Sequence, residues 1–149
     1  MLFKTGIPKS TLKCVLLIDD DKLTNFVNKI IVDTMCCPDH VVRKESVRSA
    51  LEYLSDSADS YGQIPFPDLI FLDIDMPNSD GWQFLNSFKD IKNNLPYVPV
   101  IIMLSGFVDS QTISKASSFG DLAGIIKKPM STENYNEITS EYFTPGVNK

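Results

Sequence analysis

Short runs of apolar residues alternate along the chain with longer segments in which apolar residues recur at every third or fourth position. The short runs indicate buried strands, and the longer segments indicate helices with one apolar face. Strands are expected at residues 14–20, 40–45, 68–74, 98–106 and 123–129, and helices at residues 21–37, 46–58, 82–91, 110–120 and 131–143. Five strand–helix pairs predict an α/β fold with a doubly wound, five-stranded parallel sheet.

The pattern fills nearly all of the 149 residues, which predicts a single domain. We expect an N-terminal extension over residues 1–13, the domain over residues 14–143 and a C-terminal tail over residues 144–149. The strand at 40–45 is the most polar of the five, so it is expected toward an edge of the sheet.

Local signals define several helix ends. Pro38 is expected to stop the first helix, Ser46 to cap the second, and Gly120 to end the fourth. The first helix carries six apolar residues at helical spacing: Leu23, Phe26, Val27, Ile30, Ile31 and Met35. In the third helix, the spacing of the large apolar residues favours core packing over an aromatic binding box: Trp82, Phe84, Leu85 and Phe88.

The composition excludes several classes of protein. A formal net charge of -5 argues against direct nucleic-acid binding, which usually requires clustered Lys and Arg. No apolar run approaches the roughly 20 residues of a membrane span, and "MLFKTGIPKSTLK" lacks the apolar centre of a signal peptide. Cys14, Cys36 and Cys37 are wrongly spaced for a disulfide framework or a zinc site. We therefore expect reduced thiols and a cytoplasmic protein.

Polar residues gather where the predicted strands end. In an open parallel sheet, ligands bind beyond the carboxyl ends of the strands, so these residues are the candidates for chemistry. In chain order they are Asp19, Asp20, Asp21, Asp73, Asp75, Ser105, Lys127 and Lys128, and Pro129 closes the last strand.

Carboxylates brought this close must be protonated, paired or metal-bound, because their mutual repulsion is costly. Mg²⁺ suits the cluster, since it takes one or two carboxylates together with water, a backbone carbonyl and often a phosphate oxygen. A carboxylate can also attack a phosphoryl group and form an acyl phosphate if the phosphoryl oxygens are neutralised. The strand ends therefore predict phosphoryl chemistry with Mg²⁺.

Four segments at these strand ends carry a family resemblance: "LLIDDD", "PDLIFLDIDMP..DG", "PVIIMLSG" and "IIKKP". Over residues from about 14 to 143, the chain resembles the receiver domain of two-component response regulators. The resemblance implies a flavodoxin-like (βα)5 fold with strand order 2-1-3-4-5. It also implies a signalling protein that accepts a phosphoryl group and later loses it by its own catalysis, and that is otherwise not an enzyme.

The resemblance also assigns roles to the strand-end residues. Asp73 would be the phosphoacceptor, with Ser105 as the switch hydroxyl and Lys128 as the phosphoryl contact. Mg²⁺ would be held by Asp19, Asp20, Asp73 and the backbone carbonyl of Asp75. The Lys128–Pro129 peptide bond would be cis, as is usual in the family.

The partners implied by the family are a histidine kinase or phosphotransfer protein as donor, and a protein effector on the face formed by helix 4, strand 5 and helix 5. With 21 residues after Lys128, we expect a stand-alone receiver, monomeric or weakly dimeric, that signals through protein contacts without direct nucleic-acid or membrane binding. The choice between a shuttle and an effector-binding regulator stays open.

Two residues depart from the family pattern. Ile125 stands three positions before Lys128, where the family commonly has an aromatic switch residue, so that form of switching is in doubt. The Asp75 side chain would face the phosphoryl group, where a carboxylate could orient the hydrolytic water.

Other interpretations compete at single residues and for the whole chain. We expect Asp21 to stabilise a helix N-terminus rather than to bind the metal. We expect His40 to be a surface residue rather than a site of phosphoryl transfer. Phe107 could gate access to the site. A degenerate receiver that acts only as a binding module is one rival function. A haloacid-dehalogenase-type phosphatase is another, although its acidic motifs would come in the opposite order.

Overall fold

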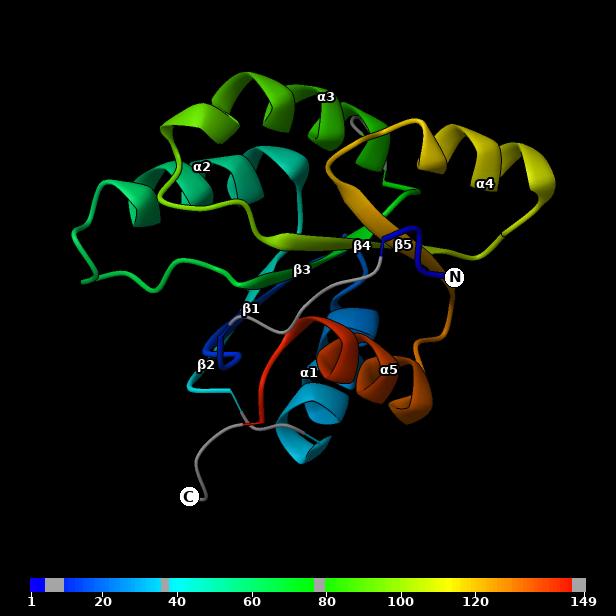
Figure 1. Ribbon diagram of the computed structural model, residues 1–149, viewed down its shortest axis with the longest axis horizontal. Helices are drawn as coiled ribbons and strands as arrows, with labels where there is room; N and C mark the ends of the chain where they lie inside the picture. The colour runs from blue at the N-terminus through cyan, green and yellow to red at the C-terminus, as the bar shows by residue number, and fades with distance from the viewer. Residues whose placement is uncertain (5–9, 36–37, 77–79, 146–149) are drawn as a thin grey trace.

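The structure is a computed structural model that describes residues 1–4, 10–35, 38–76 and 80–145. Strands and helices alternate along the chain as the sequence predicts (Figure 1). The strands are β1 (Cys14–Ile18), β2 (His40–Lys44), β3 (Leu69–Asp73), β4 (Val100–Ser105) and β5 (Leu122–Lys127). The helices are α1 (Lys22–Met35), α2 (Val47–Ala58), α3 (Gly81–Ile91), the short 3-10 helix η1 (Lys92–Asn94), α4 (Ser110–Ser117) and α5 (Thr132–Tyr142).

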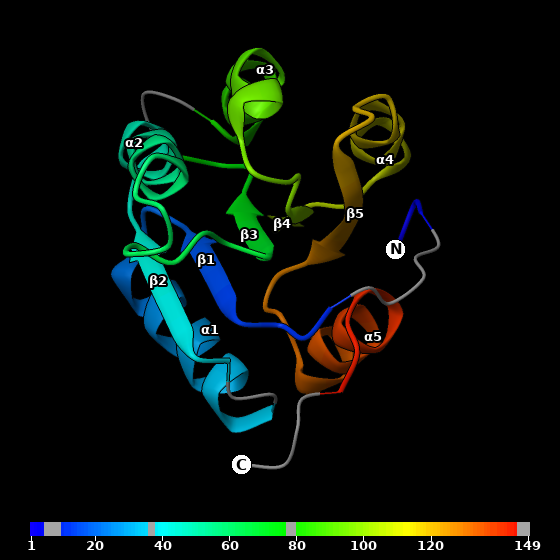
Figure 2. The same cartoon turned by 60° about the vertical axis from the view of Figure 1, so that its left-hand side comes forward.

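The five strands form one parallel sheet in the order β2-β1-β3-β4-β5, which confirms the predicted fold and strand order. Helices α2, α3 and α4 cover one face of the sheet, and α1 and α5 cover the other (Figure 2). Every residue of β1 and β3 is buried, as expected for strands covered on both faces. The more polar β2 lies at an edge, as predicted.

Four helices are preceded by a capping residue whose side chain accepts a hydrogen bond from a backbone N–H of the first turn. Ser46 caps α2 in this way, as predicted, and Asp80, Asp109 and Ser131 cap α3, α4 and α5. The prediction that Gly120 ends the fourth helix is wrong. Helix α4 ends at Ser117, because the chain tightens there into i→i+3 hydrogen bonds.

Helix α1 turns most of its apolar residues outward. Asn25, Asn28 and Val32 are its buried residues. Four apolar side chains on the opposite side, which we call the α1 stripe, are 43 to 68% exposed: Leu23, Phe26, Val27 and Ile30. The apolar spacing predicted the helix correctly, but it does not mark the face that the helix buries.

Residues before β1 also contact the domain. Met1–Phe3 run beside β5, with an antiparallel bridge between Leu2 and Gly124. Thr11 and Thr144 form a parallel bridge beyond α5. The chain from residue 1 to residue 4 therefore packs on the sheet, although the sequence indicated only an extension there.

Cys14 is a buried free thiol whose pKa is raised to about 12, mainly by burial. Cys36, Cys37 and part of the turn predicted between β3 and α3, residues 77–79, lie outside the described residues. Over the described part of the chain, we find no helix of the length and apolar character needed to span a membrane.

Candidate functional site

Three carboxylates meet at the carboxyl ends of β1 and β3. Asp73 is the last residue of β3, and Asp19 and Asp20 follow the end of β1 at Ile18. One oxygen from each of Asp19, Asp20 and Asp73 lies within 4.8 Å of the others. Asp19 and Asp73 are 2% and 1% exposed, whereas Asp20 is exposed to solvent. The cluster therefore has a buried side in the sheet and an open side toward solvent.

Lys128 supplies a positive charge to the buried side of this cluster. Its Nζ lies 2.8 Å from Asp73 Oδ1 and 3.0 Å from Asp19 Oδ2. The Lys128 backbone N–H donates to the Ser105 carbonyl at 2.8 Å, which ties the end of β5 to β4. The peptide bond from Lys128 to Pro129 is cis, as the resemblance implied. The neighbouring Lys127 is exposed.

The pKa of Asp73 is raised to about 6: burial is the main cause, the hydrogen bond from Lys128 lowers the pKa, and the nearby Asp19 carboxylate raises it. Burial alone would lower the pKa of Lys128, but its contacts with Asp73 and Asp19 raise it overall. Lys128 therefore stays charged at neutral pH, and Asp73 is ionised in most molecules. An ionised, buried carboxylate beside an ammonium group can act as a nucleophile, and Asp73 has this arrangement.

Backbone contacts fix the position of the two buried carboxylates. The Asp21 N–H donates to Asp19 Oδ1 at 2.9 Å, and the Asp75 N–H donates to Asp73 Oδ1 at 3.1 Å. The buried Asn25 amide donates to the carbonyls of Asp19 and Lys44, which joins the ends of β1 and β2. The sequence pattern did not single out Asn25, because a polar residue within an apolar-period helix gives no signal of burial.

Gly81 is a second residue whose contribution the sequence did not reveal. A Cβ atom at Gly81 would lie 2.8 Å from the Asp73 carbonyl oxygen and 3.0 Å from Ile74 Cα. Its backbone N–H donates to the Ile74 carbonyl at 3.0 Å. The first residue of α3 therefore packs directly on the backbone that carries Asp73, and only glycine allows this approach without a shift.

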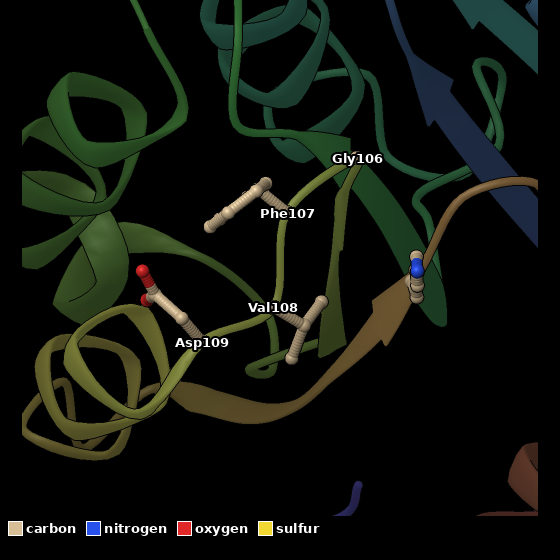
Figure 3. Close-up of a pocket in the computed structure, with 5 residues that line it drawn as sticks. Gly106, Phe107, Val108 and Asp109 are labelled. Carbon is tan, nitrogen blue, oxygen red and sulfur yellow. The ribbon is translucent and has the colours of Figure 1, made fainter.

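Ser105 ends β4, and its hydroxyl contacts the following loop. It donates to the Phe107 carbonyl at 2.8 Å and accepts from the Phe107 N–H at 3.1 Å. The Phe107 side chain is 71% exposed. Gly106, Phe107, Val108 and Asp109 line a shallow pocket together with Lys127, and Phe107 and Val108 point to different sides of the loop (Figure 3).

The donor set fits a hard cation. All three clustered side chains are carboxylates, which Mg²⁺ prefers, and Asp20 opens the cluster to water and to an incoming oxygen ligand. Asp19 Oδ2 is buried and, apart from the Lys128 ammonium, has no hydrogen-bond donor among the described residues. One ammonium against three carboxylates leaves negative charge that a divalent cation would balance.

Three further residues from the sequence analysis lie away from the cluster or beside it. Asp21 accepts hydrogen bonds from the Leu23 N–H and the Thr24 hydroxyl, which fits its predicted place at a helix N-terminus. His40 is exposed on the edge strand β2. The Asp75 side chain is exposed, and only its backbone N–H is bonded to Asp73.

Known proteins are similar to this chain in sequence. The chain is 26% identical over 153 residues to the osmosensing histidine protein kinase SLN1 of Saccharomyces cerevisiae, covering 95% of this chain and 12% of the kinase. It is 27% identical over 124 residues to the two-component response regulator ARR10 of Arabidopsis thaliana, covering 83% of this chain and 20% of that protein. The chain thus spans a fifth or less of these two relatives.

Solved structures share the fold. A two-component response regulator from Cytophaga hutchinsonii is 26% identical, with a TM-score of 0.74 over 87% of this chain and 96% of that one. The receiver domain of the Arabidopsis thaliana histidine kinase CKI1, complexed with Mg²⁺ and BeF3⁻, matches with 24% identity and a TM-score of 0.70 over 86% of this chain and 90% of that one.

The sequence profile of the response regulator receiver domain matches residues 15–139. That match includes residues of all five strands, the three clustered carboxylates and Lys128. Receiver domains are signalling modules of two-component systems and not enzymes in the usual sense. The chain belongs to the response regulator receiver domain family.

Proposed function

We propose that this protein accepts a phosphoryl group on Asp73 with the help of Mg²⁺ and passes the signal on through protein contacts. The observation that carries the proposal is the pairing of Asp73, which is 1% exposed, with Lys128 at 2.8 Å beside the cluster of Asp19 and Asp20. A structural ion pair would need one carboxylate for one ammonium. The additional carboxylates are explained if a divalent cation and a phosphoryl group bind at this site.

In the proposed reaction, an Asp73 carboxylate oxygen forms a bond to phosphorus while the bond from phosphorus to the donor breaks. A phosphohistidine donor leaves as imidazole and takes up a proton, and acetyl phosphate leaves as acetate. Lys128 stabilises charge on the transferred oxygens, and Asp19 and Asp20 would hold the Mg²⁺ that neutralises the remainder. Hydrolysis of the acyl phosphate then restores the Asp73 carboxylate.

Ser105 and Phe107 provide a route from this event to the surface. Phosphorylation adds about one further negative charge and new acceptor oxygens at Asp73. For its hydroxyl to donate to one of those oxygens, Ser105 has to give up its 2.8 Å hydrogen bond to the Phe107 carbonyl. We propose that the loop from Gly106 to Asp109 moves with that exchange. Such a movement does not require an aromatic switch residue at the position of the buried Ile125.

The α1 stripe is the surface that we propose for the donor. Helix α1 begins at Lys22, two residues after Asp20, so a protein that brings a phosphohistidine to Asp73 over the open side of the cluster reaches the start of α1. Leu23, Phe26 and Ile30 are 49 to 68% exposed there. A neighbouring apolar surface is what a docked protein would bury. A histidine kinase or phosphotransfer protein is the class of donor that the family implies.

The test is incubation of the protein with acetyl phosphate, or with a beryllium fluoride mimic, in the presence and absence of Mg²⁺. Wild type should gain one phosphoryl group only with Mg²⁺, and Asp73→Asn should gain none. Asp20→Asn is the matched variant for the metal: it should need more Mg²⁺ while keeping the acceptor. Modification that persists in Asp73→Asn would contradict the assignment. No modification of wild type would favour a module that only binds.

A further inference from the structure

A short strand from the start of the chain pairs with the outer edge of β5. The Phe3 N–H donates to the Ala123 carbonyl at 2.7 Å, and the Ile125 N–H donates to the Met1 carbonyl at 2.9 Å. The Met1 nitrogen donates to the Ile125 carbonyl at 2.7 Å. Figure 2 shows this segment beside β5, between α4 and α5. The edge of β5, which is part of the surface that the family resemblance assigns to an effector, is therefore already paired.

Gly124 makes this close pairing possible. A Cβ atom at Gly124 would lie 2.7 Å from the Met1 carbonyl oxygen and 3.1 Å from Leu2 Cα, which are backbone atoms that cannot turn aside. Gly120, in the turn before β5, has no atom within 4 Å of such a Cβ. A glycine within a strand usually destabilises that strand. The close approach of the bound segment explains why β5 has a glycine at this position.

The two apolar side chains of the segment lie on opposite faces of the sheet, as in a strand. Leu2 packs on the cluster that includes Ile126 and Tyr135, on the α1 and α5 side. Phe3 packs on the cluster that includes Ile125, on the α2 to α4 side. Lys4 makes two further polar contacts. Its ammonium donates to the Gly120 carbonyl, before β5, and its backbone carbonyl accepts from the Tyr142 hydroxyl of α5.

We propose that the edge of β5 is a binding surface for an extended antiparallel strand, and that Met1–Lys4 occupy it as an intramolecular ligand. The strand that fits has two consecutive apolar residues, one aliphatic and one aromatic, which reach the two faces of the sheet. A protein partner that docks on α4, β5 and α5 has to displace this segment, and its own strand takes over the backbone hydrogen bonds of Ala123 and Ile125.

The bound segment also protects the edge. An open edge strand presents unpaired N–H and C=O groups, which invite pairing with another chain. A tethered segment has an effective concentration of about millimolar for its site, so a free strand of equal intrinsic affinity competes poorly. None of these contacts involves Asp73, so the inference holds whether or not that residue accepts a phosphoryl group.

The test uses variants of the 149-residue chain and a labelled peptide with the sequence of residues 1–6, without any phosphoryl donor. In wild type, the Ile125 amide should exchange slowly and the peptide should not bind. In the double variant Leu2→Asp/Phe3→Asp, exchange at Ile125 should be at least about tenfold faster, because the edge opens, and the peptide should bind. Phe3→Pro, which removes the N–H that bonds to Ala123, gives a second way to open the edge.

Gly124→Ala, added to the double variant, should weaken peptide binding at least about tenfold, because its Cβ closes the approach to the backbone. Gly120→Ala in the same background is the matched control and should leave binding unchanged. Slow exchange at Ile125 in both opened variants would overturn the proposal. Peptide binding that is absent from the opened variants, or equally strong with Gly124→Ala, would overturn it as well.

Discussion

The acidic cluster and the α1 stripe are adjacent regions that depart from the usual distribution of residues in opposite ways. The cluster buries charge: Asp19 and Asp73 are almost fully covered. The α1 stripe leaves Leu23 and Phe26 68% and 52% exposed, while the same helix buries two asparagines. Both arrangements are costly in an isolated domain, because buried charge lacks hydration and exposed apolar surface orders water.

The two regions differ in which groups offset the cost of the buried charge and of the exposed apolar surface. The cluster contains part of its own compensation, since Lys128 contacts both buried carboxylates. The α1 stripe has no such partner within the described residues, because its exposed side chains face away from the rest of the fold. We infer that Lys128 and a bound cation neutralise the negative charge of the cluster, whereas another protein buries the apolar surface of the α1 stripe.

Removal of Lys128 should have the largest effect on stability. Lys128→Ala leaves Asp19 and Asp73 buried without their counter-charge, and should lower the free energy of unfolding by about 2–3 kcal/mol at pH 7, since the pair is partly open to water. Urea unfolding measures this. Lys127→Ala, at the exposed neighbour, is the control and should change stability by less than about 0.5 kcal/mol. Equal losses in both variants would mean that the cluster is not held by Lys128.

Removal of the Asp73 charge should act in the opposite direction. The pKa of Asp73 is about 6 in the folded protein against an ordinary 3.8, so the folded state holds this proton more tightly and stability falls as pH rises from about 4 to 6. Asp73→Asn should therefore raise the free energy of unfolding by about 1–2 kcal/mol at pH 7, after the loss of the Lys128 contact is allowed for. The gain should shrink toward pH 4. Urea titrations at both pH values, without Mg²⁺, decide this, and a gain that grows on acidification contradicts it.

Polar substitutions in the α1 stripe should separate docking from folding. Phe26→Ser and Ile30→Ser should change stability by less than about 0.5 kcal/mol, because both side chains are about half exposed. Val32→Ala, at a fully buried position of the same helix, should cost about 1–3 kcal/mol.

Phosphoryl transfer from a phosphotransfer protein should slow about tenfold or more in the two serine variants, since hot-spot contacts of this kind cost about 1.4 kcal/mol or more. Transfer from acetyl phosphate should stay at the wild-type rate. If both donors slow equally, the α1 stripe supports the site itself and does not serve as a docking surface.

The smallest effect is expected at Asp75. Its exposed side chain can reach water near the phosphoryl group, so Asp75→Asn should lengthen the half-life of phosphorylated protein by about two- to fivefold through loss of a base. Stability should not change, because only the backbone N–H of Asp75 is bonded to Asp73. Loss of the phosphoryl group can be followed by mass spectrometry. An unchanged half-life would remove the side chain from the mechanism.

The sequence predicted the sheet and the cluster because both follow from short-range patterns. Parallel strands bring their carboxyl ends together, so Asp19, Asp73 and Lys128 could be gathered from three distant segments without coordinates. Ser46 was predictable as a helix cap for the same reason, since its hydrogen bond is made three residues away.

Features set by contacts between distant parts of the chain were not predictable. The buried face of α1 depends on the backbone carbonyls that Asn25 meets at the ends of β1 and β2. Gly81 and Gly124 look like ordinary glycines in the sequence, yet each allows a close approach of another backbone, at Asp73 and at Met1. The extended segment of residues 1–3 is too short to show a hydrophobic period of its own.

The most direct test of the central claim is to locate the phosphoryl group chemically. An acyl phosphate is reduced by borohydride to an alcohol, which converts a phosphorylated aspartate to homoserine and marks its position for peptide mass spectrometry. After treatment with acetyl phosphate and Mg²⁺, we expect homoserine at position 73, and at neither Asp19 nor Asp20. Homoserine at Asp19 or Asp20, or a fully unmodified residue 73 in phosphorylated protein, would contradict it.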